Sequence, residues 1–295
     1  MKAKGAVIAA PFTFARLPDK HHAMTTASAE PFGKFKAAQR EAWAAFAPVE
    51  INTIIPAAKL VTFAQVTAGQ KVLDVACGTG VVAVSAARRG AKVCGLDLSP
   101  ALLERAHSNA EIASVSIDLT EGDIEALPYP DAAFDVVLSQ FGHIFAPRPA
   151  VAVKEMLRVL KVGGRIAFST WPPEHFTGRL FTLIASYAPP PLPGSEQAAP
   201  PALWGDPNIV RERLGAQVRD LQFERDTLVA PTLSPQHMRS RQERTVGPLI
   251  KLIDELGGNV AKLAKLRADL EVLIGQAFSD NATHQHFLMT RATKA

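Results

Sequence analysis

The chain has 295 residues, of which 47% are hydrophobic and 20% are charged, and its formal net charge is +4. This composition excludes wholesale disorder, and the length exceeds one average domain but suits a single elaborated α/β domain with a sizeable core. The basic residues are scattered, and Glu243 interrupts the densest cluster, which is Arg239, Arg241 and Arg244. A solvated face explains this charge better than a surface for nucleic acid or a membrane.

The first part of the chain, residues 1–31, is expected to be a disordered N-terminal extension. Its apolar stretch is short and ends at Pro11, so a signal peptide is not predicted. No run reaches the ~18 apolar residues of a membrane span. The two cysteines, Cys77 and Cys94, have no partners at metal-ligand spacing. We therefore expect a cytoplasmic protein with no metal site, no integral membrane association and no nucleic-acid partner.

Residues 32–67 are predicted to form one or two helices before the first strand. Trp43 and Phe46 supply bulky apolar positions, and Pro48 interrupts the pattern. Because these helices need not belong to the sheet, we expect a helical lid.

Strands and helices alternate between residues 68 and 171. Strands are predicted at 71–75, 91–96, 115–119, 135–139 and 165–170. Helices are predicted at 80–89, from Ser99-Pro100 onward and at 150–160, with Gly163-Gly164 ending the last. This alternation predicts an α/β fold, a Rossmann-like and mostly parallel sheet with helices on both faces. Residues 68–171 are the expected cofactor-binding core, with the ligand at the carboxyl ends of the strands.

The pattern loosens after residue 171. Residues 172–217 are expected to be a proline-rich cap insertion, irregular over 188–207. Residues 218–295 are expected to complete the core with strands and helices. The elements predicted there are a strand at 218–229, a helix at 234–256 kinked at Gly247-Pro248, a helix at 259–278 and a closing strand at 286–291.

The segment 72–80, Val-Leu-Asp-Val-Ala-Cys-Gly-Thr-Gly, is an apolar strand that carries one carboxylate and then breaks into a glycine turn before a helix. This order places backbone N–H groups and a helix N-terminus around a small ligand. The carboxylate of Asp74 suits a cationic group and would repel a dinucleotide pyrophosphate. The pattern therefore points to S-adenosylmethionine, which carries an ammonium and a sulfonium.

Five segments in this order resemble the class I S-adenosylmethionine-dependent methyltransferases, closest to the ubiquinone/menaquinone-type (methyltransferase type 11-like) branch. They are 72–80, 95–100 (Gly-Leu-Asp-Leu-Ser-Pro), 122–130 (Gly-Asp-Ile-Glu-Ala-Leu-Pro-Tyr-Pro), 134–137 (Phe-Asp-Val-Val) and 157–165 (Leu-Arg-Val-Leu-Lys-Val-Gly-Gly-Arg). Two positions depart from the family pattern: Ala76 replaces a glycine, and Val162 replaces the usual proline.

The predicted cofactor-binding residues are Asp74, Ala76, Gly78, Thr79, Gly80, Asp97, Leu98, Asp123, Ile124, Ser139 and Gln140. Gly78 and Gly80 let the loop backbone approach the ligand. Asp74 would hold the amino group, and its alternative role is to bind N–H groups of its own loop. Asp97 has the spacing of a ribose acid, and its alternative is to cap the next helix.

The remaining contacts are implied by the resemblance and by position. Leu98 would press on one adenine face. Asp123 and Ile124 would meet the adenine edge and face, as the resemblance implies, whereas Asp123 is alternatively a plain turn carboxylate. Ser139 and Gln140 would line the floor near the sulfonium.

Methyl transfer from a sulfonium is an in-line displacement, and a base is needed only if the acceptor must lose a proton. His143 is the candidate catalytic base, and its alternative is a loop histidine packed between Phe141 and Phe145. His175 is a weaker candidate. Aromatic residues near the expected crevice suggest a small, hydrophobic or aromatic acceptor; these are Trp43, Phe46, Phe141, Phe145, Trp171, Phe176 and Trp204.

Three rival functions stay open. Gly78-x-Gly80-x-x-Ala83 also fits an NAD(P)-dependent oxidoreductase, although Asp74 opposes it. A nucleic-acid methyltransferase lacks support because no basic stripe interleaved with aromatic residues is present. The third is a non-catalytic S-adenosylmethionine-binding relative. The oligomeric state is also open, a homodimer included.

Overall fold

The computed structural model describes residues 32–190 and 197–295, so the expected extension 1–31 lies outside it. The strands are β1 (Lys71–Val75), β2 (Lys92–Asp97), β3 (Ile117–Glu121), β4 (Phe134–Gln140), β5 (Leu160–Thr170), β6 (Val218–Pro231), β7 (Phe278–Ser279) and β8 (Ala282–Lys294). The α-helices are α1 (Gly33–Ala42), α2 (Ile54–Phe63), α3 (Val81–Ala87), α4 (Pro100–Ile112), α5 (Pro149–Val159), α6 (Phe176–Tyr187), α7 (Pro207–Leu214), α8 (Pro235–Thr245), α9 (Gly247–Leu256) and α10 (Val260–Gly275). The 3₁₀ helices are η1 (Trp43–Thr53), η2 (His143–Phe145), η3 (Pro201–Gly205) and η4 (Gly215–Gln217).

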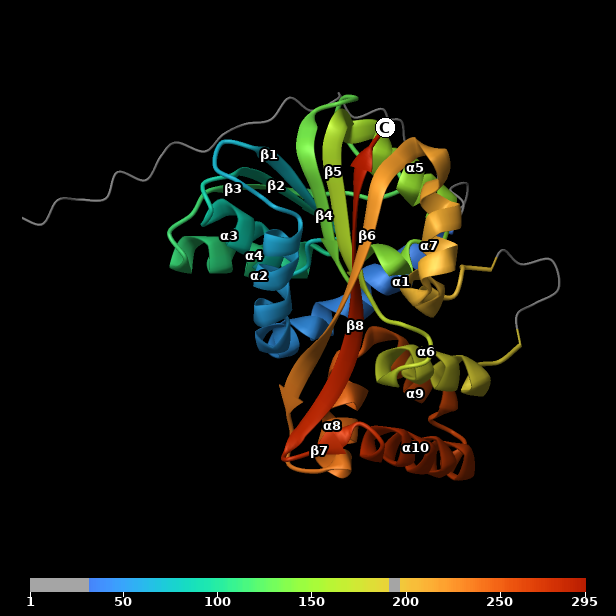
Figure 1. The fold of residues 1–295 in the computed structure, drawn as a ribbon. Helices are drawn as coiled ribbons and strands as arrows, with labels where there is room; N and C mark the ends of the chain where they lie inside the picture. Colours follow the sequence, from blue (N-terminus) through green and yellow to red (C-terminus); the bar gives the residue numbers. More distant parts are fainter. Residues whose placement is uncertain (1–31, 191–196) are drawn as a thin grey trace, which may run out of the picture.

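The strands form one sheet in the order β3-β2-β1-β4-β5-β8-β6, with β7 paired to β8. Strands β1 to β5 are parallel, whereas β8 is antiparallel to both β5 and β6. Figure 1 shows helices on both sides of this sheet. The predicted Rossmann-like α/β fold with a mostly parallel sheet is confirmed.

The central strands are buried on both faces, as parallel strands covered by helices are. Val72, Leu73 and Val75 of β1 are fully buried, and so are Val136 and Val137 of β4. This apolar centre fixes the register of β1 between β2 and β4 and therefore fixes the position of the loop that follows β1.

The N-terminal segment divides into α1, η1 and α2. Pro48 lies inside η1, where the chain is a 3₁₀ helix. Gly33–Phe63 is long and apolar enough, by length and composition only, to meet the criteria for a membrane span. Within it, Leu60 and Val61 are fully buried in the core, and other side chains line the cavity described below.

Three details of the sequence-based prediction differ from the structure. The helix predicted at 150–160 ends at Val159, and Gly163-Gly164 lie inside β5. Ser99 occupies the position before α4, but its side chain makes no capping hydrogen bond. Helix α6 was not predicted, because Pro172-Pro173 just before it favoured irregular chain over a helix.

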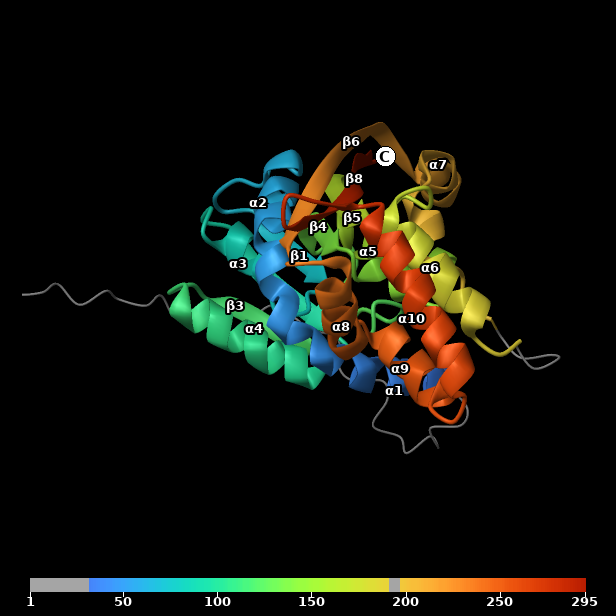
Figure 2. The same ribbon diagram turned by 90° about the horizontal axis from the view of Figure 1, so that it is seen from below.

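A second layer lies beyond the carboxyl ends of the parallel strands (Figures 1 and 2). Helices α6, α8, α9 and α10 form it, and the ribbon of β6 and β8 extends down to it from the sheet. Side chains cap two of the helices at their N-termini, because Ser234 accepts the N–H of His237 and Asn259 accepts that of Lys262. This layer covers the edge at which α/β sheets bind ligands.

Candidate functional site

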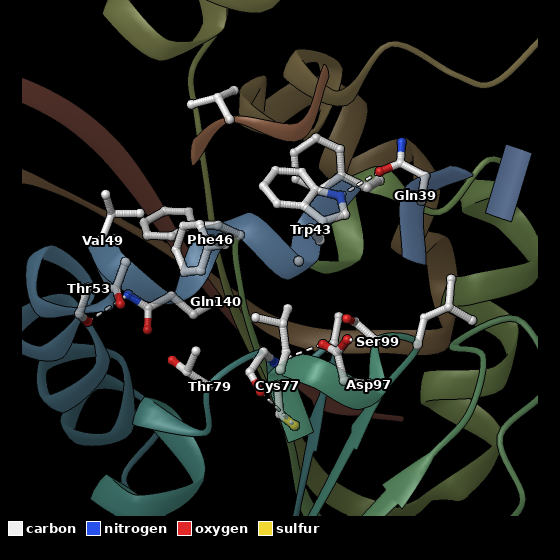
Figure 3. Close-up of a pocket in the computed structure, with 18 of the residues that line it drawn as sticks. Gln39, Trp43, Phe46, Val49, Thr53, Cys77, Thr79, Asp97, Ser99 and Gln140 are labelled. Carbon is white, nitrogen blue, oxygen red and sulfur yellow. Dashed lines mark hydrogen bonds between the residues drawn. The ribbon is translucent and has the colours of Figure 1, made fainter. Parts of the chain in front are cut away.

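A cavity of about 280 Å³ lies at the carboxyl ends of the parallel strands. Its lining includes the loops after β1, β2, β3 and β4, α1 and η1, and parts of α6, β6 and α8. Figure 3 shows Trp43 and Phe46 of η1 facing Cys77, Thr79 and Asp97 across it. The loops of the parallel strands form the floor of the cavity, and the helical elements form its roof.

The loop after β1 turns sharply at three residues with left-handed backbone. Ala76, Gly78 and Gly80 have φ of 52°, 55° and 77°. A Cβ at Gly78 would meet no atom within 4 Å, so this backbone is open to a ligand. A Cβ at Gly80 would lie 2.9 Å from Cβ of Ala106 in α4, and Gly80 does not line the cavity. Gly80 therefore permits close packing of α4, which differs from the predicted contact with the ligand.

Asp74 lines the cavity from inside β1 and is 1% exposed. Its Oδ2 accepts the Ala83 N–H at 3.1 Å, whereas Oδ1 has no hydrogen-bond partner. Burial raises the pKa of this carboxyl well above its usual value, the Ala83 N–H opposes the shift, and Asp97 adds to it. An unpartnered buried carboxylate oxygen in a cavity is suited to the ammonium of S-adenosylmethionine.

Asp97 ends β2, and both of its oxygens bind the backbone. Oδ2 accepts the Gly78 N–H at 2.7 Å and Oδ1 accepts the Ser99 N–H at 2.8 Å. The structural role weighed for this carboxylate is therefore present. Burial raises its pKa, although the N–H groups of Ser99 and Gly78 oppose the rise. A carboxylate has about four acceptor positions, so Asp97 can still accept a further donor.

Leu98, Asp123 and Ile124, which the sequence analysis placed against the adenine, all line the cavity. Lys36 of α1 forms ion pairs with Asp123 at 2.5 Å and with Glu125 at 3.0 Å. Sequence reasoning missed Lys36, since the pair joins residues far apart in the chain. Asp123 thus fastens α1 over this part of the cavity and is more than a turn carboxylate.

Residues of the loop floor divide between the cavity and the protein interior. Thr79 and Gln140 line the cavity, whereas Ser139 does not. The Ser139 hydroxyl donates to the Val75 carbonyl at 2.8 Å, so its side chain joins β4 to β1. Gln140 Nε2 donates to the Thr53 carbonyl at 3.1 Å, and its Oε1 is buried without a partner.

His143 does not line the cavity. Its side chain is fully buried between Phe168 and Trp204, both at 4.7 Å between ring centroids, and neither ring nitrogen has a hydrogen-bond partner. Burial lowers the pKa of His143 to about 3, and the charge of Arg213 adds to this. The geometry therefore does not support His143 as the base, and its aromatic neighbours differ from the predicted Phe141 and Phe145. His175, the weaker candidate, does not line the cavity either.

We expect replacement of His143 by leucine to leave methyl transfer intact and to change the pH dependence of stability. The folded protein keeps His143 neutral, whereas the unfolded chain protonates it below its ordinary pKa near 6.5, so stability falls as the pH falls. Between pH 7 and pH 5 the wild type should lose about 2 kcal/mol more than His143→Leu. Urea unfolding at both pH values measures this, and a large loss of turnover in the variant at pH 7.5 would restore the catalytic role.

The far side of the cavity is aromatic and apolar. Phe141 and Trp171 stack there at 3.9 Å between centroids, and Phe145 lies 4.7 Å from Trp43 and 5.6 Å from Phe181. Five of the seven aromatic residues singled out in the sequence line the cavity, whereas Phe176 and Trp204 do not. Sequence reasoning missed the contribution of α8, whose cavity-lining residues are Met238, Arg241, Gln242 and Thr245.

Comparison with known proteins shows similarity to methyltransferases over part of the chain. Residues 73–168 match a family model described as a methyltransferase domain. An uncharacterized protein of Mycobacterium tuberculosis (strain H37Rv) is 34% identical over 236 residues, which cover 80% of this chain and 85% of that protein. A demethylmenaquinone methyltransferase of Tropheryma whipplei (strain Twist) is 37% identical over 133 residues, which cover 43% of this chain and 53% of that protein.

Solved structures agree on the fold. A putative methyltransferase from Bacillus halodurans matches with a TM-score of 0.54 and 22% identity, covering 81% of this chain and 98% of that chain. The YcgJ protein of Bacillus subtilis matches with a TM-score of 0.54 and 19% identity, covering 81% and 97%. At these identities the likeness concerns the fold alone. The chain belongs to the class I S-adenosylmethionine-dependent methyltransferases that its sequence resembles, and S-adenosylmethionine is its cofactor.

Proposed function

We propose that the protein transfers the methyl group of S-adenosylmethionine to a small hydrophobic or aromatic acceptor bound between the strand loops and the helical roof. One observation carries this proposal: the cavity continues from the acidic cofactor loops to a wall of aromatic side chains. Acids suit the cationic donor, and aromatic walls suit an apolar ring.

The cofactor contacts that we propose follow the geometry of the floor. Asp74 Oδ1 accepts the ammonium, the Gly78 backbone approaches the ligand, and Asp97 accepts ribose hydroxyls. Leu98 and Ile124 hold the adenine faces. The unpartnered Asp74 Oδ1 and the open space above Gly78 support this assignment.

The reaction that we propose relies on alignment. The bound cofactor supplies a methyl group on a sulfonium, and the thioether left behind is neutral. The chain therefore needs to hold the acceptor in line and to exclude water, which are both effects of positioning. Gln140, with Oε1 free and Nε2 fixed to Thr53, is placed to accept a hydrogen bond at the floor.

Residues 32–67 and 172–217 are proposed to cover the acceptor. Within the first range, Trp43 and Phe46 line the cavity, and Glu50 holds η1 against α4 through Arg105 and Asn109. Within the second, Thr177, Leu180 and Phe181 line it. Residues of α1, η1 and α6 from these ranges thus contribute to the roof.

Replacement of Phe181 by alanine should lower kcat/KM for the acceptor by about 10- to 100-fold, because a buried phenyl group contributes about 1.5–3 kcal/mol. The dissociation constant for S-adenosylmethionine should change little. Phe223→Ala is the matched control, since Phe223 is also partly buried but lies outside the cavity.

The experiment that tests the function is an assay with labelled S-adenosylmethionine against small apolar and aromatic molecules, with duplex DNA and RNA as comparison acceptors. Label in a small molecule supports the proposal, and label in nucleic acid alone contradicts it. A cytoplasmic location is part of the proposal, supported by Cys77 and Cys94, which are both buried and form no disulfide bond.

A further inference from the structure

Arg241 is a cation in the roof of the cavity whose guanidinium contacts neutral atoms. Its Nη1 donates to the Pro231 carbonyl at 3.0 Å, and its Nη2 lies 2.9 Å from Sδ of Met238. No carboxylate among residues 32–190 and 197–295 forms an ion pair with it. A guanidinium has five N–H donors, so most of them stay available to a ligand.

The acids near Arg241 along the chain are bound to other arginines. Glu243 forms ion pairs with Arg239 at 2.5 Å and with Arg267 at 3.0 Å, and Arg239 also pairs with Glu271 at 2.7 Å. Burial would raise the pKa of Glu243, but the hydrogen bonds from Arg267 and Arg239 hold it below its usual value. Arg241 differs, since burial lowers the pKa of its guanidinium and no acid opposes this. Arg40 also lines the cavity, but it forms an ion pair with Glu121 at 2.7 Å, so the two cavity-lining arginines differ in this respect.

Gln242 gives a second, independent sign of a polar ligand at this wall. Its side chain is buried, with 6% of the residue exposed, and it lines the cavity. Its Oε1 has no hydrogen-bond partner. Because buried polar atoms are nearly always satisfied in folded proteins, this oxygen is suited to accept a hydrogen bond from a ligand.

We infer that Arg241 binds a carboxylate on the methyl acceptor, so that the substrates of this enzyme are apolar or aromatic carboxylic acids. The inference rests on the proposed function, because it assigns the roof side of the cavity to the acceptor. Arginine binds a carboxylate through two parallel N–H bonds, which also fixes the orientation of the group. Gln242 Oε1 accepts an N–H or O–H of the same molecule.

The charges in the cavity favour this class. The acids Asp74 and Asp97 lie on the floor, at the cofactor end, whereas Arg241 lies on α8, above it. An anionic acceptor is attracted both to Arg241 and to the sulfonium of the donor. The rival occupant is the carboxylate of the cofactor itself, and the cofactor affinity of an Arg241 variant separates the two.

The test uses two carboxylates, cinnamate and octanoate, and their neutral amides as probes. Binding to the full chain saturated with S-adenosylhomocysteine is measured by calorimetry at pH 7.5. We expect each acid to bind at least about tenfold more tightly than its amide, and Arg241→Gln to abolish this preference. Arg241→Lys should keep part of it. Arg244→Gln is the matched control, because Arg244 is exposed on the same helix and outside the cavity.

Equal binding of acids and amides to the wild type overturns the inference while leaving the proposed function intact, and this comparison needs no variant. A preference that survives in Arg241→Gln also overturns it. A loss of S-adenosylmethionine affinity in Arg241→Gln, with the preference for acids retained, assigns Arg241 to the cofactor. Failure of all four probes to bind contradicts the proposed function as well.

Discussion

Replacement of Asp74 by asparagine should weaken S-adenosylmethionine binding by about 100-fold, the equivalent of about 2.7 kcal/mol. The carbonyl oxygen of the new side chain could still accept the Ala83 N–H, but a neutral amide cannot form an ion pair with an ammonium. The same change should raise the melting temperature of the ligand-free protein. Burial and the charge of Asp97 both raise the pKa of Asp74, so an ionised Asp74 destabilises the ligand-free protein. Asparagine removes this buried charge.

The pH dependence of that stability gain has a definite sign. A folded-state pKa raised above the unfolded value lowers stability as the pH rises, so the cost of Asp74 is present at neutral pH. The advantage of Asp74→Asn should therefore shrink as the pH falls toward the range in which carboxylates take up protons. Calorimetry with the cofactor and thermal unfolding without it measure both effects. Asp254→Asn, at an exposed position on α9, is the control. Unchanged affinity in Asp74→Asn would refute the assigned ammonium site.

Replacement of Gly142 by alanine should disturb the cofactor loop from the opposite side. A Cβ at Gly142 would lie 2.6 Å from both the Cβ and the carbonyl oxygen of Ala76. Since backbone must move to relieve this, we expect a loss of about 1–3 kcal/mol in the free energy of unfolding. The turn at Ala76 would shift, so cofactor affinity should fall by about tenfold as well.

The control is Gly258→Ala, because a Cβ at Gly258 meets no atom within 4 Å and lies outside the cavity. Urea unfolding and cofactor titration of both variants measure the difference. Equal stability of Gly142→Ala and Gly258→Ala would show that the loops after β1 and β4 are not packed as described.

The cofactor half of the molecule was predictable because its signals are local. Glycine turns, a carboxylate inside a strand and the alternation of strands and helices all act within a few residues, so the core and most floor residues followed from the sequence. The roof was less predictable. Its contacts join distant segments: Lys36 with Asp123, Glu50 with Arg105 and Thr53 with Gln140. No spacing rule reports such pairs.

The geometry does not support the prediction for His143 because a segment distant in the sequence packs against it. Position in the loop after β4 suggested a base, but η3 brings Trp204 against the imidazole and closes it off. The aromatic neighbour comes from about sixty residues further along the chain, a distance that residue periodicity does not report. Ser139 was predicted to line the floor near the sulfonium, but its hydroxyl instead donates a hydrogen bond to the Val75 carbonyl of β1.

The order of the last strands has a consequence for synthesis. Strand β8 lies between β5 and β6, although the ribosome makes β6 first. Strands β1 to β4 have all their strand neighbours once β5 has emerged, whereas β5 and β6 each lack a neighbour until β8 is made. In the nascent chain the five parallel strands, whose loops line the floor of the cavity, can therefore pair before the ribbon of β6 and β8 that reaches the helical roof is complete.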